Sequence, residues 1–103
     1  MFVYFDGAGF KVAEPEDCSR LCVRSNLDAT AAGDALADGD WGMRGPSSGT
    51  VWLKIETLRS AGSVISHHPD WPARFDAMIG YACQQGWLSA NGDFLAAHIE
   101  SAS

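Results

Sequence analysis

The residues with the clearest chemical potential form one short run, Ser66–Trp71, which reads SHHPDW. Adjacent histidines can act as a paired acid and base near neutral pH, because the unperturbed pKa of histidine is close to that range. Asp70 places a carboxylate beside them. The run therefore predicts one of two features. It is either an acid/base site at His67 and His68, or the turn that leads into a helix, with the proline fixing the backbone.

Cysteine and histidine are also the usual ligands of zinc, and the chain has four such residues that could be combined. Cys18 and Cys22, together with His67 and His68, supply sulfur and nitrogen ligands. Structural zinc sites favour Cys-x2-Cys or Cys-x4-Cys spacing, whereas three residues separate these two cysteines. The total of three cysteines is an odd number, which fits reduced thiols better than a disulfide framework. We therefore expect no metal ion and no cofactor.

Aromatic residues outside the expected core indicate a contact surface. Trp41 and Met43 lie in a glycine-rich stretch that has the composition of a solvent loop. Trp52 lies on a predicted strand and faces away from its apolar neighbours, so it is either covered by that loop or exposed at an interface. Together with Trp71, which follows the histidines, these three residues are the predicted binding residues.

The charge of the chain narrows the class of partner. It carries 7 basic and 13 acidic residues, a net charge of −6, and the basic residues form no run. This field repels phosphate backbones and anionic lipid headgroups, so we expect neither nucleic acid nor a membrane as a partner. The chain shows no signal peptide and no run of about 20 apolar residues, which predicts a cytoplasmic protein. Its richness in Ala, Gly and Asp is typical of bacterial coding sequences of high GC content.

The length and the local patterns predict the architecture. At 103 residues the chain can bury one core, so we expect a single domain over residues 1–103, and Met1 and the short tail indicate a complete small protein. Strand-like and helix-like segments are mixed, which predicts an α+β fold: an antiparallel sheet of three or four strands with two or three helices packed on one face. The expected core residues are Phe2, Val3, Phe10, Val12, Leu21, Val23, Leu36, Leu53, Leu58, Phe75, Met78, Ile79 and Leu88.

The individual elements follow from apolar periodicity and from Gly, Pro, Asn and Asp at the boundaries. In chain order they are a hairpin over 2–13 turning at Asp6-Gly7; a strand over 20–25; a helix from Asn26 or Asp28 to Gly39; a loop over 39–49; a strand over 51–55; a short helix over 56–61 ended by Gly62; and a helix over 70–85. Residues 87–100 are expected to form either a second hairpin around Asn91-Gly92 or a closing helix.

The helix over 70–85 is the best defined of these elements. Asp70 is the predicted N-cap, and Pro72 lies in the first turn, where its missing N–H is not needed. Gly86 stands where a helix ends in a Schellman motif, so that Trp87 or Leu88 packs back on the last turn. The apolar residues fall on one continuous stripe, made of Trp71, Phe75, Met78, Ile79 and Ala82.

The run His67-His68-Pro69-Asp70-Trp71 resembles the His-His-Pro signature of the pterin-4a-carbinolamine dehydratases. In that family His-His-Pro-x-Trp follows a helix, and a further histidine on a later strand completes a pterin site. The stretch 86–100 is also similar to the end of that family, with its Gly-x-Ser/Thr turn, Asp-Phe and closing Ala-rich helix. The resemblance implies that His67 and His68 are acid/base residues, that Trp71 is a wall of a pterin pocket, and that the protein is oligomeric.

Three functions follow from these residues. We expect a non-catalytic binding protein that acts through a protein partner or through self-association, because Trp41 and Trp52 indicate a contact surface and no G-x-S-x-G motif or P-loop is present. The first alternative is an enzyme with a dehydratase-like reaction at His67 and His68. The second is a winged-helix-like regulator, which the net charge opposes.

Overall fold

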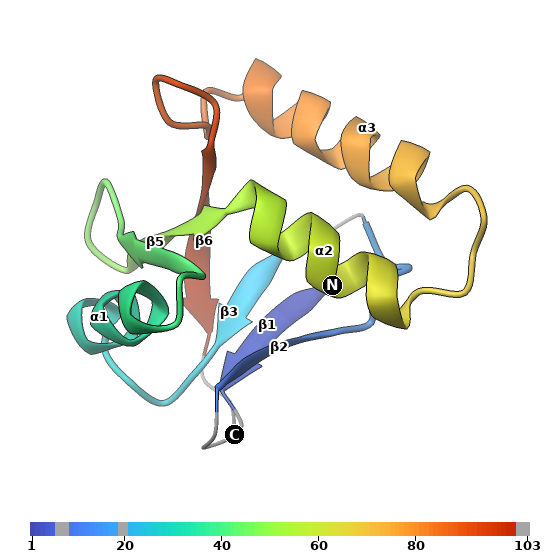
Figure 1. The fold of residues 1–103 in the computed structure, drawn as a ribbon. Helices are drawn as coiled ribbons and strands as arrows, with labels where there is room; N and C mark the ends of the chain where they lie inside the picture. Colours follow the sequence, from blue (N-terminus) through green and yellow to red (C-terminus); the bar gives the residue numbers. More distant parts are fainter. Residues whose placement is uncertain (6–8, 19–20, 101–103) are drawn as a thin grey trace.

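The computed structural model describes residues 1–5, 9–18 and 21–100 (Figure 1). In chain order the elements are β1 (Phe2–Phe5), β2 (Phe10–Ala13), β3 (Cys22–Arg24), α1 (Ala29–Asp38), β4 (Gly42–Arg44), β5 (Thr50–Lys54), α2 (Ile55–Ile65), α3 (Trp71–Gln84) and β6 (Phe94–Glu100). Within the described ranges, no helix combines the length and apolar character needed to cross a membrane.

The strands form one curled sheet in the order β2-β1-β3-β6-β5-β4. β1 pairs antiparallel with β2, as the predicted hairpin requires, although Asp6-Gly7 itself lies outside the described residues. β3 lies parallel to both of its neighbours, β1 and β6, and β5 runs antiparallel to β4 and β6. The α+β class is confirmed. The predicted sheet of three or four antiparallel strands was wrong, because the sheet has six strands and is mixed.

Strand β4 lies inside the span that its glycine content marked as a loop. Gly42 is needed there for contact rather than for a turn, because a Cβ at this position would collide with the carbonyl oxygen of Trp52. Gly33, in the interior of α1, has a similar role. A Cβ on Gly33 would lie 2.7 Å from the Cα of Arg44, so the missing side chain lets α1 approach β4 closely. Glycine composition alone does not separate close backbone approach from a flexible loop.

The last segment is a strand and not a helix. The chain turns at Asn91-Gly92, where Gly92 has φ +78°, and Leu88 bridges to Leu95 before β6 inserts between β3 and β5. Leu95 and Ala97 alternate on the buried face, which is the strand period hidden by the two adjacent alanines. Because β6 is central in the sheet, the segment does not form the exposed wing that a winged-helix reading requires.

The helix ends show which local signals were correct. Asp28 caps α1 by accepting a hydrogen bond from the Ala31 N–H at 2.7 Å. α3 ends in the predicted Schellman motif, in which Gly86 N–H donates to Cys83 O and Trp87 N–H donates to Ala82 O. Asp70 precedes α3 but makes no side-chain cap; its carboxylate accepts from Arg74 instead.

The core lies between the sheet and the helices α1 and α2. Figure 1 shows α2 crossing in front of the sheet. Leu36 of α1 and Leu58 of α2 are both fully buried there against the sheet. Eight predicted core residues are confirmed as buried: Val3, Phe10, Val12, Val23, Leu36, Leu53, Leu58 and Phe75. The other five are half-buried: Phe2, Leu21, Met78, Ile79 and Leu88.

Helix α2 continues past the glycine that was predicted to end it. Gly62 is buried within α2 and faces the indole of Trp71, whose nearest ring atoms would lie 2.5 Å and 2.6 Å from an added Cβ. A helix interior normally disfavours glycine by about 1 kcal/mol relative to alanine. Here the glycine provides the space in which the first residue of α3 packs on α2.

Candidate binding groove

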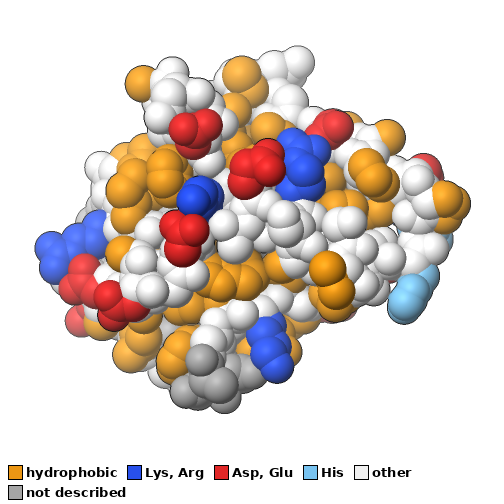
Figure 2. All heavy atoms as spheres, viewed as in Figure 1, with side chains coloured by type: hydrophobic (Ala, Val, Ile, Leu, Met, Phe, Trp, Pro, Cys, Tyr) orange, Lys and Arg blue, Asp and Glu red, His pale blue; other side chains and the backbone are white. Residues whose placement is uncertain are grey.

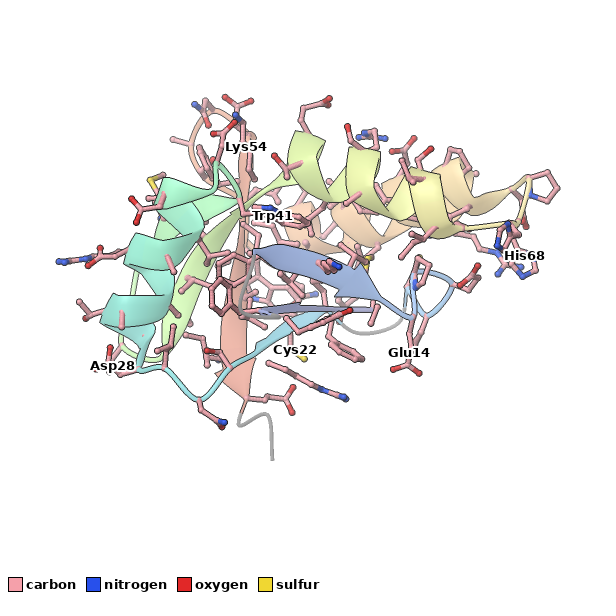
Figure 3. The ribbon with its side chains drawn as sticks, turned by 60° about the horizontal axis from the view of Figure 1, so that its bottom comes forward. Glu14, Cys22, Asp28, Trp41, Lys54 and His68 are labelled. Carbon is pink, nitrogen blue, oxygen red and sulfur yellow. The ribbon has the colours of Figure 1, made fainter. Side chains whose placement is uncertain are left out.

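The two adjacent histidines lie on the loop that joins α2 to α3. Both are exposed, and Figure 3 shows His68 at the outer edge of the molecule. His68 Nδ1 lies 4.0 Å from the Asp70 carboxylate, which also accepts from Arg74 Nε at 3.2 Å. An acid is therefore near the histidines, but the whole group is solvated. Neither histidine lines the main groove of the molecule, which lies between α3 and the sheet.

Glu16, from the segment after β2, binds the beginning of this histidine loop. Its carboxylate accepts a hydrogen bond from the Ser66 hydroxyl at 3.3 Å. The pKa of Glu16 is lowered by a hydrogen bond from its own backbone N–H, and then by the His67 N–H and the Ser66 hydroxyl, against an opposing effect of burial. These contacts hold the backbone of the loop, and they leave the imidazole rings outside.

Trp71 was predicted to be a binding residue, but the structure places it in the core. It is 1% exposed, and its indole Nε1–H donates to the carbonyl oxygen of Pro15 at 2.6 Å. The ring also stacks obliquely on Phe75, with centroids 5.0 Å apart. Trp71 therefore anchors α3 to α2 and to the segment after β2, and it offers no surface to a ligand.

The sheet separates Trp41, which packs on the core, from the other two predicted binding residues, Met43 and Trp52. Trp41 is half-buried and lies 6.3 Å from Phe10 between ring centroids, so it packs on the core. Met43 is 39% exposed and is paired in register with Trp52, which places both side chains on the same face of the sheet. Of the four predicted residues, only Trp52 lines the main groove.

That groove has a volume of about 1100 Å³ and lies between α3 and the sheet. The sheet contributes its floor. Trp52 is paired with Ala96 and Thr50 with His98, so these four side chains share the face opposite to the buried Val51. The small Ala96 leaves open space beside the Trp52 ring.

Helix α3 forms the wall of the groove. Arg74, Ala77, Met78 and Tyr81 line it, and they fall at helical spacing on one side of α3. The Schellman motif then brings Trp87 back, so that its ring packs edge-on against Tyr81 with centroids 5.9 Å apart. Trp87 is held in place through its carbonyl oxygen, which accepts from the Ala96 N–H at 2.8 Å.

Polar groups interrupt this apolar lining in two places. His98 and Glu100 come from β6, on the sheet side. Cys18 and Arg74 lie on the side where α3 begins, close enough for the Arg74 charge to act on the Cys18 thiol. Burial raises the pKa of that thiol, and the Arg74 charge opposes the effect. Figure 3 shows the sulfur of Cys22, another lining residue, on the side of the sheet away from α2.

Little in the sequence indicates this groove, because its lining residues are spread from Cys18 to Glu100. One signal was available. Tyr81 lies outside the apolar stripe of α3, and Trp87 was expected to pack back on the last turn, so an aromatic pair at this helix end could have been inferred. The structure also describes no cluster of three or more His, Cys, Asp or Glu side chains suited to a metal ion.

Comparison of the chain with protein-family models, with curated proteins and with solved structures finds no match. The chemistry of the groove and of the histidine loop is therefore the basis for the functional argument.

Proposed function

We propose that this protein is a non-catalytic binding protein and that the groove between α3 and the sheet is its binding site. The observation that carries the proposal is the lining itself, in which Trp52, Met78, Tyr81 and Trp87 surround an open volume of about 1100 Å³. Ligand sites are typically concave, mostly apolar hollows of about 300–1000 Å³ with a few polar groups that set orientation. The volume of the groove is slightly above this range.

The exposure of the aromatic rim supports binding over a purely structural role. Tyr81 is 57% and Trp87 47% exposed, although together they bury an edge-to-face contact. Covering an exposed aromatic ring with a ligand favours binding by roughly 25 cal/mol per Å² of apolar area removed from water. The rim is therefore where an occupant would add the most contact.

A protein partner or a second copy of the chain is the second candidate for the occupant. The same rim supports it, because exposed Trp and Tyr residues dominate the binding energy of many protein interfaces. Figure 2 shows basic side chains beside acidic ones on the face it displays, rather than a single-sign surface. Lys54 and Asp40, for example, form an exposed ion pair. That mixed surface is compatible with close approach of another protein.

The test combines oligomeric state with groove occupancy. We expect light scattering after size-exclusion chromatography to give one mass over a wide concentration range, and an uncharged apolar fluorescent probe such as N-phenyl-1-naphthylamine to bind with its affinity reduced in Trp52→Ala. A mass that rises with concentration, and that falls again in Trp87→Ser, would favour the second copy. Probe binding equal in wild type and Trp52→Ala would contradict the proposal that the groove is the site.

The resemblance of the histidine run supports an acid/base reaction at His67 and His68 as the alternative function. One contact favours it: the Asp70 carboxylate lies 4.0 Å from His68 Nδ1. A general acid or base must also reach its substrate within hydrogen-bond distance, which requires a pocket around the two rings. Dehydration of a pterin-4a-carbinolamine by the wild type, lost in the double variant His67→Ala/His68→Ala, would establish this function in place of the first.

A further inference from the structure

The Arg74 side chain lines the groove with part of its guanidinium group uncommitted. Its Nε donates to Asp70 Oδ2 at 3.2 Å. In the part of the chain that the structure describes, that carboxylate is the only hydrogen-bond partner of the side chain, so its two terminal nitrogens carry N–H donors without a protein acceptor. The planar edge of a guanidinium group matches a carboxylate, which it can bind through two parallel hydrogen bonds.

The apolar part of the groove begins beside this donor edge. Along α3, Arg74 is followed on the same side by Ala77, Met78 and Tyr81, and the lining continues to Trp87 and Trp52. An occupant that contacts both parts needs a charged head at the start of α3 and an apolar body along the helix towards the aromatic residues. The acidic net charge of the chain disfavours anions in general, so selection of a carboxylate would depend on this local pairing.

From this arrangement we propose that the groove binds amphipathic carboxylates, with the carboxylate on the terminal nitrogens of Arg74 and the apolar body against Met78, Tyr81 and Trp52. The inference rests on the proposed function, since it names the ligand class of the same site. Fatty acids and aryl carboxylic acids share the required chemistry. The Trp52, Tyr81 and Trp87 rings favour flat aryl ligands, and the extended lining along α3 favours alkyl chains. The experiment therefore includes both classes.

The experiment measures dissociation constants by calorimetry for probes matched in shape and differing in charge. Dodecanoate is compared with dodecanol and with dodecyltrimethylammonium, and 2-naphthoate with 2-naphthol, all below micellar concentrations. We expect each carboxylate to bind up to about 5-fold more tightly than its neutral partner, which is the upper range for a solvent-exposed ion pair. Arg74→Gln should remove this ratio, and it should fold normally because, among the described residues, the Arg74 side chain hydrogen-bonds only to the exposed Asp70 that precedes α3.

Two controls separate the outcomes. Arg44→Gln makes the same chemical change on β4, outside the groove, and should keep the ratio; Trp52→Ala should weaken charged and neutral probes alike. Carboxylate binding should also slow alkylation of Cys18, which lines the groove, and not of the exposed Cys83, which does not. Equal binding of dodecanoate and dodecanol, or an unchanged ratio in Arg74→Gln, would overturn this inference and leave groove binding intact. Failure of every probe to bind, including exclusion by a dimer, would overturn the proposed function as well.

Discussion

The histidine loop and the groove between α3 and the sheet relate to the sequence in opposite ways. In the loop, six consecutive residues carry two imidazoles, a carboxylate and an indole. Folding disperses them: both imidazoles point into solvent and Trp71 is buried. In the groove, single residues of ordinary type come from β3, β5, α3 and β6, and folding brings them together around one hollow.

The difference shows that reactive side chains adjacent in a sequence need not lie together in the folded protein. Neighbouring residues of a loop need not share an environment: the histidine side chains are exposed, whereas Trp71, the first residue of α3, is buried. Residues on one side of a helix and on one face of a sheet converge, even when dozens of positions separate them. Variants in the two regions can test whether the loop is structural and the groove functional.

Replacement of Trp71 by alanine should have the largest effect on stability. The variant loses a ring that is 1% exposed and leaves the Pro15 carbonyl without its indole donor, so we expect a loss of about 3–5 kcal/mol in the free energy of unfolding. Chemical denaturation measures it. Trp87→Ala is the matched control at the groove and should lose less than half as much, because Trp87 is 47% exposed. Similar losses in both variants would remove the distinction between the two regions.

Two glycine variants test the packing of α2 on Trp71. In Gly62→Ala the new methyl would overlap the buried indole ring, and we expect the free energy of unfolding to fall by about 1–3 kcal/mol. Gly80, in α3, has no atom within 4 Å of an added Cβ, so Gly80→Ala should raise stability by about 0.5–1 kcal/mol through helix propensity. If Gly62→Ala is neutral or stabilising, the close contact between α2 and Trp71 is not as described.

Replacement of Trp52 by alanine should reduce binding rather than folding. Its ring is half-buried beside Ala96 in the groove floor, and we expect an approximately 10-fold loss of affinity for an apolar probe, comparable to one aromatic contact. Met43→Ala is the control, because Met43 is the cross-strand neighbour of Trp52 and does not line the groove. An equal loss in Met43→Ala would indicate that the probe binds the open sheet instead.

The double variant His67→Ala/His68→Ala should leave both stability and groove binding nearly unchanged. Both side chains are exposed, and substitutions at such positions usually change stability by less than about 0.5 kcal/mol. Thermal unfolding and the probe titration provide the measurements. A loss of binding in a variant that unfolds at the wild-type temperature would show that the loop belongs to the site.

The pH dependence of the loop attachment should also be a small effect. The pKa of Glu16 is lower in the folded protein than in the unfolded chain, so its contribution to stability is complete above the unfolded pKa and is lost as the pH falls through the folded one. Glu16→Gln should therefore have a lower free energy of unfolding than the wild type at neutral pH, and the stabilities of the two proteins should converge in acid. Parallel stability profiles down to the lowest pH would show that the Glu16 carboxylate does not bind the loop.

Local patterns in the sequence were sufficient for several elements. The cap at Asp28, one of two residues expected there, the strand expected over 51–55 and observed at Thr50–Lys54, and the Schellman end of α3 depend on interactions within a few residues. Their signals are therefore contained in short windows of the sequence. The α+β class and most of the core followed in the same way, because apolar residues at strand or helix spacing must be buried on one face.

The errors arose where a residue's environment comes from a distant part of the chain. Gly42 and Gly62 looked like a loop and a helix end, and in the structure each makes room for a tryptophan: the Trp52 backbone and the Trp71 ring. The strand at Phe94–Glu100 was ambiguous because its two alanines are helix formers, and pairing with β3 and β5 outweighs that preference.

Composition and short-range periodicity were therefore enough to predict the fold class, the acidic charge and several of the local elements. The burial of Trp71, the grouping of Trp52 with Tyr81 and Trp87, and the position of Arg74 at their groove follow from the packed structure. The physical reason is that a binding surface is made by the order of strands and the placement of a helix across them. Those are set by the packing of the whole core and not by any single segment.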